Sequence, residues 1–373
     1  MPVKVYIVDD SATVRTVLGM LLEKDPDIEV LGTAANASIA LRKMEKQWPD
    51  VIITDLEMPG MHGLDFIRHV MQTRPTPFVV CSSHVGHGAA AAVEALSLGA
   101  VEIIVKPNVG LQSFLEEITQ TMVASVKAAA RAVVRQPLRR DHREAQHREA
   151  PYREAQHRET LQRDLQHREA QPRELPRIVR RPYSVIGIGS STGGTTVVEQ
   201  ILKQMKPDVP GIVVVQHMPQ YFTGLFAKRL NELCRIEVRE AQDGDSVQPG
   251  VALIAPGGSQ LALAGYPGHL RVQVSDGAPV NGHKPSVNVL FRSMADICGD
   301  KAIGIILTGM GDDGADGLLK MRKAGALTVG QDEASSAVYG MPKVAMNNGA
   351  VQYQLSYPDI APFINDALFP DPK

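Results

Sequence analysis

Short apolar runs alternate with amphipathic segments through most of the chain, in two blocks that a polar stretch separates. In the first block, four runs of strand length end at Val8, Ile53, Cys81 and Val105. The segment from Ser11 to Glu23 follows the first run and collects its apolar residues on one side of a helix. Alternating strands and helices predict a parallel sheet with helices on both faces, so we expect an α/β domain over residues 1–125.

A second alternation of strands and helices begins at Tyr183. Its strand-like runs cover residues 185–188, 212–215, 251–254, 302–307 and 326–329. A hairpin is predicted where the apolar run Leu261–Leu263 is followed closely by Leu270–Val272. We therefore expect a second domain over residues 183–373, with α/β/α layers around a mostly parallel sheet, joined to the first domain by a linker over residues 126–182.

The linker contains a degenerate five-residue repeat over residues 142–176, in which each of seven arginines is followed by an acidic residue. A step of five residues makes no apolar stripe on a helix, and the prolines in the repeat interrupt helices. The sequence favours a solvated, partly helical spacer. Its four histidines are not organised as a closed metal site, and the paired opposite charges argue against a tail that binds nucleic acid.

Composition limits which cellular compartment and which classes of partner we expect for the protein. The chain has 373 residues and a net charge of −2, so it carries no overall attraction to nucleic acid. Its three cysteines lie far apart and form neither a metal spacing nor a disulfide framework, which favours a reducing compartment. No signal peptide and no apolar stretch of membrane-spanning length is visible. We expect a cytoplasmic protein without membrane insertion.

Polar side chains gather where the strands of the first block end. Asp9 and Asp10 follow the first strand, Asp55 follows a second run, and Ser82 and Lys106 follow two more. Ligands of parallel sheets bind beyond these strand ends. Three carboxylates in one place repel unless a cation lies among them, and oxygen ligands suit Mg²⁺. One acidic strand end can be a helix cap, but four coordinated strand ends indicate a site for Mg²⁺ and a phosphoryl group.

The second block opens with a glycine-rich turn at residues 189–194, between an apolar strand and an expected helix. The spacing Gly189-x-Ser191-x-Gly193 fits a nucleophile elbow, which lifts a serine hydroxyl clear of its turn. The turn also resembles the start of a dinucleotide fingerprint, but Thr192 stands where the third glycine is needed. A P-loop is excluded because its Gly-Lys-Ser/Thr ending is missing. A turn without chemistry is the remaining alternative.

A histidine and two acids follow other strands of this block: His217, Asp312 and Asp313. A serine hydroxyl needs a base to become a nucleophile, and the base needs an acid that orients it. A lone histidine at a strand end is more often structural, but a serine and an acid at matching strand ends favour catalysis. The order serine, histidine, acid differs from that of α/β-hydrolases, so that fold is not expected.

Three segments of the first block form a further pattern: Val8-Asp9-Asp10-Ser11, the stretch from Thr54 to Gly63, and Val105-Lys106-Pro107. On these residues the block resembles the receiver domain of two-component response regulators. The resemblance implies a flavodoxin-like, doubly wound sheet and a histidine kinase as partner. It implies that Asp55 accepts the phosphoryl group, that Asp10 and Asp55 hold Mg²⁺ with Asp9 assisting, and that Ser82 and Lys106 contact the phosphoryl group. The usual aromatic switch residue is not evident; Glu102 or Ile104 lies nearby.

The second block carries Gly189-Ser190-Ser191-Thr192-Gly193-Gly194, Gln216-His217-Met218-Pro219 and the segment from Leu307 to Gly314. With further similarity at residues 253–258 and 285–288, it resembles the catalytic domain of chemotaxis protein-glutamate methylesterases. The resemblance implies Ser191, His217 and Asp313 as catalytic triad, with backbone N–H groups near Thr192 and Met310 facing the oxyanion. The family has alanine at position 190 and commonly asparagine at 312, so Ser190 and Asp312 are expected to be decoys.

Together the two resemblances imply a phosphorylation-regulated enzyme of chemotaxis-type signalling. It would hydrolyse glutamate methyl esters on methyl-accepting chemotaxis receptors, release methanol, and deamidate receptor glutamines. The mechanism would be a serine acyl-enzyme without a cofactor, and the receiver would shield the site until Asp55 is phosphorylated. A transcriptional regulator is disfavoured because the second block shows no basic recognition helix. A nucleotide-dependent dehydrogenase is disfavoured by the missing third glycine.

Overall fold

A computed structural model describes residues 1–82, 87–106, 112–134 and 181–369. The described residues belong to one compact unit. The charged repeat at 142–176, and Pro107 of the receiver pattern, lie outside the described residues.

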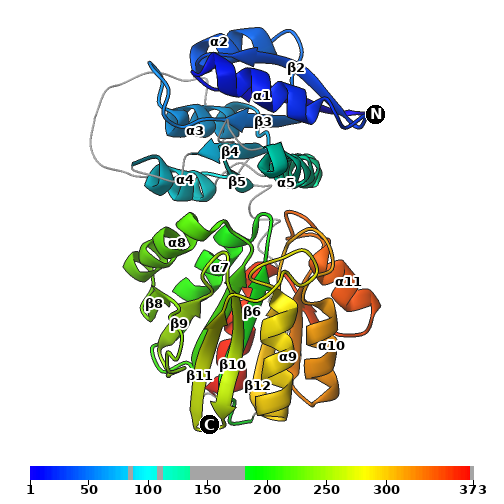
Figure 1. Cartoon of the computed structure of the whole chain (residues 1–373). Helices are drawn as coiled ribbons and strands as arrows, with labels where there is room; N and C mark the ends of the chain where they lie inside the picture. The colour runs from blue at the N-terminus through cyan, green and yellow to red at the C-terminus, as the bar shows by residue number, and fades with distance from the viewer. Residues whose placement is uncertain (83–86, 107–111, 135–180, 370–373) are drawn as a thin grey trace, which may run out of the picture. The chain divides into compact units, whose positions relative to one another are not determined.

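The first block is a five-stranded parallel sheet in the order β2-β1-β3-β4-β5. Its strands are β1 (Val3–Val8), β2 (Ile28–Ala34), β3 (Val51–Thr54), β4 (Phe78–Ser82) and β5 (Glu102–Val105). Its helices are α1 (Ala12–Leu22), α2 (Ala37–Met44), α3 (Gly63–Thr73), α4 (His87–Ser97) and α5 (Gln112–Arg131) (Figure 1). The strand order reverses between β1 and β3, which is where such sheets bind ligands. The last helix, α5, continues past residue 125, where the sequence predicted the end of the domain. That domain boundary stays a prediction.

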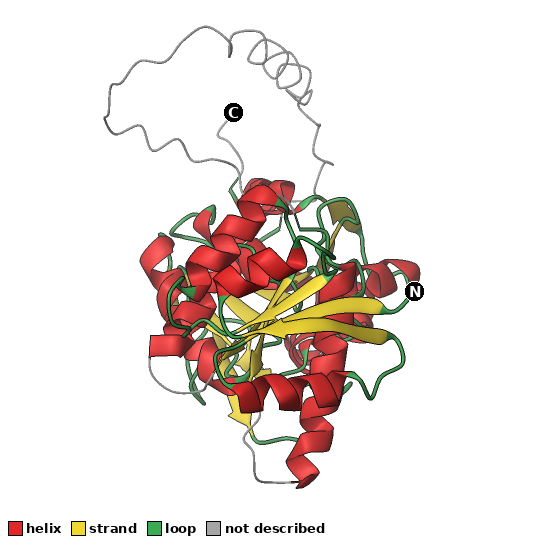
Figure 2. Ribbon diagram, turned by 90° about the horizontal axis from the view of Figure 1, so that it is seen from above, coloured by secondary structure: helices red, strands yellow, loops and turns green. Residues whose placement is uncertain are grey.

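Burial explains why the apolar runs of this block became its central strands. Every residue of β3 and β4 is buried, because helices cover both faces of the sheet (Figure 2). Side-chain caps start the first two helices: the hydroxyl of Ser11 accepts from the N–H of Val14, and the amide oxygen of Asn36 accepts from the N–H of Ile39. Asp10 therefore lies immediately before a capped helix.

The second block is a seven-stranded sheet in the order β14-β13-β12-β6-β7-β9-β8, and all its pairs are parallel. Its strands are β6 (Val185–Ser190), β7 (Gly211–Gln216), β8 (Glu237–Glu240), β9 (Val251–Ile254), β12 (Ala302–Ile306), β13 (Leu327–Gln331) and β14 (Tyr353–Leu355). The helices are α7 (Gly194–Lys203), α8 (Gln220–Leu233), α9 (Val287–Cys298), α10 (Ala315–Lys323), α11 (Met341–Asn347) and α12 (Tyr357–Leu368), with a short 3-10 helix at Gly299–Lys301. The fold class predicted from the sequence is confirmed.

Strand β6 occupies the middle of this sheet, between β7 and β12. The chain builds one side of the sheet from β7 and the other from β12, so the strand order reverses beside β6 and opens a crevice at its carboxyl end. Close packing on β6 requires glycine, because a Cβ at Gly189 would lie 2.2 Å from a methyl carbon of Val287. The predicted hairpin is also present, as β10 (Gln260–Tyr266) paired antiparallel with β11 (His269–Ser275).

Candidate active site and receiver site

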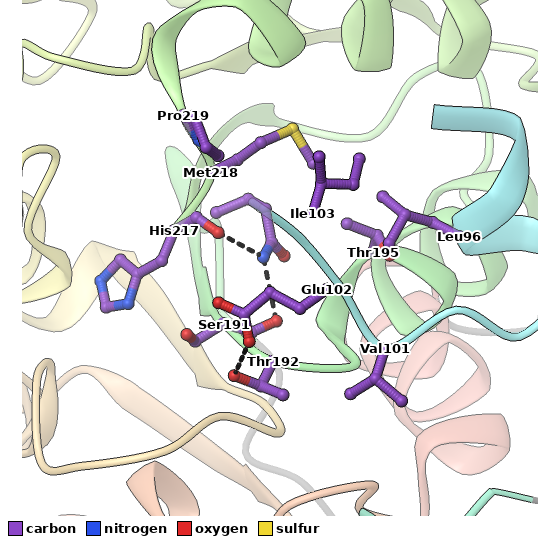
Figure 3. Close-up of a pocket in the computed structure, with 11 residues that line it drawn as sticks. Leu96, Val101, Glu102, Ile103, Ser191, Thr192, Thr195, His217, Met218 and Pro219 are labelled. Atoms are coloured by element: carbon purple, nitrogen blue, oxygen red, sulfur yellow. Dashed lines mark hydrogen bonds between the residues drawn. The ribbon is translucent and has the colours of Figure 1, made fainter. Parts of the chain in front are cut away.

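The turn between β6 and α7 presents Ser191 at the carboxyl edge of the large sheet. The backbone N–H of Ser191 donates to the carbonyl of Thr308 at 3.0 Å, which fixes the turn to the loop after β12. Gly193 has a left-handed φ of 73°, a conformation that favours glycine. Ser191 lines a pocket together with Thr192 and His217 (Figure 3).

The two neighbouring serines differ in where their side chains point. Ser190 is fully buried, and its hydroxyl donates to the side-chain oxygen of Gln216 at 2.5 Å. Ser191 instead contributes to the pocket wall. The two aspartates after β12 differ in the same way, because Asp312 is exposed and Asp313 is fully buried. The structure thus places Ser191 and Asp313, not Ser190 and Asp312, where they can serve the pocket.

His217 follows β7 and pairs with Asp313, which follows β12. The ring nitrogen Nε2 of His217 lies 2.9 Å from Oδ2 of Asp313. The other ring nitrogen, Nδ1, is buried and has no hydrogen-bond partner within the described part of the chain. The imidazole therefore has one nitrogen held by an acid and one without a partner among the described residues, and its residue lines the same pocket as Ser191.

The carboxylate of Asp313 is stabilised at the start of α9. Its oxygens accept hydrogen bonds from the hydroxyl of Ser286 at 2.7 Å and from the backbone N–H groups of Val287 and Asn288 at 2.7 and 3.2 Å. Burial alone would raise the pKa of Asp313, but the hydrogen bond and charge of His217 and the bonds from Ser286 and Val287 together hold the pKa below its usual range. The acid is therefore ionised and fixed in direction.

A second histidine, which the sequence did not single out, packs on the first. The rings of His283 and His217 stack with centroids 3.8 Å apart and an interplanar angle of 10°. Burial, together with the charge of His217, lowers the pKa of His283 to about 4. His283 is consequently a neutral ring at pH 7 that restricts the tilt of the His217 imidazole. No motif in the sequence pointed to it.

The two residues predicted to supply oxyanion donors follow neighbouring strands. Thr192 follows β6 and Met310 follows β12, and both residues line one cavity with Ser191 and His217. Within residues 181–369, neither amide N–H has a hydrogen-bond partner. Backbone donors without partners at a pocket that a serine lines are candidates for holding an oxyanion.

In the first block, Asp9, Asp10 and Asp55 converge at the reversal of strand order. Each offers a carboxylate oxygen, and these oxygens lie within 4.8 Å of one another. The ammonium of Lys106 pairs with Asp9 at 2.9 Å and with Asp55 at 2.8 Å. One ammonium leaves an excess of negative charge among three carboxylates, and this donor set fits a hard divalent cation such as Mg²⁺.

The pKa values in this cluster reflect the same crowding. Burial raises the pKa of Asp9, and the neighbouring charge of Asp55 adds to the rise, while Lys106 opposes it. Burial would lower the pKa of Lys106, but its bonds to both carboxylates raise it above the usual range. Ser82, also buried, ends the adjacent strand, and its carbonyl accepts from the N–H of Lys106 at 2.9 Å. All five predicted receiver residues therefore lie at one edge of the sheet.

Glu102, at the start of β5, joins the two blocks. Its carboxylate accepts from the hydroxyl of Ser125 in its own block and from the hydroxyl of Thr192 beside Ser191, each at 3.0 Å (Figure 3). Nearby, the N–H of Gly193 donates to the carbonyl of Val101 at 3.1 Å. Burial raises the pKa of Glu102. The residue noted only for its nearness to the expected switch position thus contacts the turn of the nucleophile candidate.

These two sites define the class of protein: a response regulator whose output domain is built as a hydrolase. Residues 186–364 match the family described as "CheB methylesterase", and residues 5–119 match the family described as "Response regulator receiver domain". Protein-glutamate methylesterase/protein-glutamine glutaminase 3 of Shewanella oneidensis is 46% identical over 96% of this chain and 97% of its own length. The corresponding protein 1 of Xanthomonas oryzae pv. oryzae is 49% identical over 92% of this chain and 94% of its own. The chain belongs to this methylesterase/glutaminase family, and it is a hydrolase.

Among solved structures, the catalytic domain of CheB methylesterase from Thermotoga maritima is 34% identical, covers 50% of this chain and 99% of its own, and has a TM-score of 0.49. Within the described residues, none of the helices combines the length and the apolar character that crossing a bilayer requires.

Proposed function

We propose that the protein hydrolyses glutamate methyl esters on methyl-accepting chemotaxis receptors and deamidates receptor glutamines, in the cytoplasm and under control of a histidine kinase. The relatives carry both activities in their names. The observation that supports the proposal most is the His217–Asp313 pair in the pocket that Ser191 lines. Incubation of the protein with methylated receptor membranes tests it: methanol release is expected, and none, even after phosphorylation, would contradict it.

In the proposed reaction, the hydroxyl oxygen of Ser191 attacks the carbonyl carbon of the ester while His217 takes the hydroxyl proton. The ester C–O bond then breaks, His217 returns the proton, and methanol leaves. Water, deprotonated by His217, attacks the acyl-enzyme and releases a glutamate carboxylate and free Ser191. A receptor glutamine follows the same path with ammonia as leaving group. Asp313 holds the imidazole and stabilises its charge.

The negative oxygen of the tetrahedral intermediate would lie between the N–H groups of Thr192 and Met310. Neither N–H group has a partner in the described part of the chain, and both residues line the cavity with Ser191. A donor that is not bound elsewhere can hold the oxygen without first breaking another hydrogen bond, which supports this role. One such donor is typically worth about 10²–10³ in rate.

Phosphorylation would occur at Asp55. Asp10 and Asp55 would hold Mg²⁺, with Asp9 assisting, and the ion would neutralise charge on the incoming phosphoryl group. Lys106 already contacts the carboxylate of Asp55, and Ser82 lies at the end of the adjacent strand, so both would contact the phosphoryl group. An aspartyl phosphate carries nearly two negative charges where the carboxylate carried one, and its oxygens would compete for Lys106 and alter the end of β5.

The contacts of β5 with the serine turn support shielding of the site by the receiver. Glu102 bonds Thr192, and Val101 bonds Gly193, directly beside the proposed nucleophile. The carboxylate of Glu102 is also the group that ester hydrolysis produces. Because Glu102 lines the pocket that Ser191 lines, it would compete with a receptor glutamyl side chain for space there.

Loss of this contact should raise the activity of the unphosphorylated protein. Glu102→Ala removes one hydrogen bond to Thr192, and a bond of this kind is worth up to about 1.5 kcal/mol, or roughly tenfold in the open population. The measurement is methanol release without a phosphodonor. The control is Glu29→Ala, an exposed acid on β2 at the opposite edge of the receiver sheet. Basal activity equal to that of wild type in Glu102→Ala would rule out this contact as part of the shield.

Asp55→Asn should abolish stimulation without abolishing catalysis. Coupling between two sites commonly changes an equilibrium about 5- to 150-fold. We therefore expect a small acyl phosphate and Mg²⁺ to raise methanol release by wild type by about this factor. The variant lacks the acceptor carboxylate and should stay within about twofold of its basal rate. Stimulation that persists in Asp55→Asn would place the phosphorylation site elsewhere.

A further inference from the structure

Gln216, the last residue of β7, is a buried amide to which the reaction assigns no role. Its side chain is 2% exposed and lies between the strand ends that carry the proposed nucleophile and base. The amide nitrogen donates to the carbonyl of Ser191 at 2.9 Å and to the carbonyl of His217 at 3.1 Å. One side chain thus holds the main chain of both residues.

Two backbone carbonyls determine the direction of this amide, and the buried hydroxyl of Ser190 stabilises it in that direction. Backbone carbonyls only accept hydrogen bonds, so the nitrogen of Gln216 must face Ser191 and His217. The amide oxygen then faces Ser190, whose hydroxyl donates to it at 2.5 Å. The N–H of His217 also donates to the carbonyl of Ser190 at 3.0 Å, so the two strand ends are joined in both directions.

The surrounding packing leaves the amide little room. A Cβ on Gly194 would lie 2.9 Å from the oxygen of Gln216 and 2.7 Å from the Cβ of Ser190. The first residue of α7 must therefore stay small for the serine–glutamine pair to fit. The arrangement is fully packed, and both N–H groups of the amide are satisfied.

We propose that Gln216 is a positioning residue that sets the distance and angle between Ser191 and His217, and that Ser190 acts through it by orienting the amide. Gln216 lines the same pocket as Ser191 and His217, but both N–H groups of its amide are bound to backbone carbonyls, so it acts through the backbone of these two residues. This inference rests on the proposed function, since it concerns how the proposed nucleophile and base meet.

Gln216→Glu is the most direct test because the carboxylate has the same shape and cannot donate to either carbonyl. A misplacement of about 1 Å at a reacting pair costs roughly 10² in rate. We expect kcat for methanol release from receptor membranes to fall about 10²-fold, with KM changed by less than about threefold, since the substrate contacts remain.

Ser190→Ala should have a smaller effect of the same kind. It removes one hydrogen bond that orients the amide, worth about 0.5–1.5 kcal/mol, and kcat should fall roughly 3- to 10-fold. The double variant should be no slower than Gln216→Glu alone, within about threefold, because Ser190 acts only through the amide. Losses that multiply in the double variant would overturn the role given to Ser190.

A matched control separates positioning from general damage to a buried amide. Gln331→Glu makes the same change at a fully buried residue on β13, and its carboxylate still accepts from the N–H of Thr308. Unfolding temperature and phosphorylation of Asp55 report folding in all variants. Gln216→Glu with kcat within threefold of wild type, or Gln331→Glu with an equal loss at equal stability, would overturn the proposal. Absence of methanol release by wild type would instead contradict the proposed function.

Discussion

Ser191→Ala is expected to reduce methanol release from methylated receptor membranes by about 10⁴-fold or more. Removal of the nucleophile from a serine triad leaves only the rate that binding and the oxyanion donors supply. Receptor binding and the unfolding temperature should change little, because the hydroxyl of Ser191 makes no hydrogen bond within the described residues. Wild type and variant are compared with Asp55 phosphorylated, so that shielding does not limit either one.

Ser190→Ala in the same assay is the natural comparison. The proposal for Ser190 predicts only a roughly 3- to 10-fold loss of kcat in this variant, because the hydroxyl of Ser190 donates to Gln216. A complete loss in Ser190→Ala, with Ser191→Ala active, would keep the class of enzyme and break the assignment of the nucleophile. Activity retained by both variants would exclude a serine mechanism at this turn.

Asp313→Asn is expected to lower kcat by about 10⁴-fold. The asparagine amide can hold the imidazole only in the wrong tautomer, and it cannot stabilise the protonated ring. Its NH₂ group must also face one of the donors at the start of α9 that now point at the carboxylate, such as the hydroxyl of Ser286 or the N–H of Val287. Kinetics at saturating receptor test this, with Asp312→Asn as the control because Asp312 is exposed.

The same variant should change how stability depends on pH. The pKa of Asp313 is lowered in the folded protein, so its carboxylate stabilises the fold at pH values above the ordinary aspartate pKa of about 3.9. This stabilisation is lost as pH falls through the lowered pKa. Wild type should therefore exceed Asp313→Asn in stability at pH 7, and the difference should shrink below about pH 4. Denaturant unfolding at several pH values would show it; a constant difference from pH 6 to pH 2 would contradict it.

The apolar runs predicted the central strands well because buried parallel strands are apolar on both faces. Three strands were indicated by no run: β8 and β14 lie at the two edges of the large sheet, and β2 lies at one edge of the smaller sheet. β8 has the sequence Glu-Val-Arg-Glu with one buried residue, and β14 has three residues. At an edge, polar side chains can reach water, so hydrophobic patterning is a weaker signal there than in central strands.

The sequence motifs also predicted site residues at the ends of strands, and the structure pairs His217 with Asp313 and gathers Asp9, Asp10 and Asp55 there. The motifs did not predict the residues that contact the candidate site residues and hold them in place. Gln216 stood in the same motif as His217, but only the register of β6 and β7 brings its amide to the carbonyl of Ser191. His283 comes from a loop far along the chain, and nothing local predicts that it stacks on His217. Glu102 has its partner in the other block.

The central position of β6 has a consequence during synthesis of the protein. His217 and Asp313 are 96 residues apart in the chain and meet only when β12 has added to the far side of β6. The receiver, which comes first, can fold while the ribosome is still producing the second block. A nascent chain that ends before β12 therefore lacks the His217–Asp313 pair, so the proposed triad would form only after the domain proposed to control it.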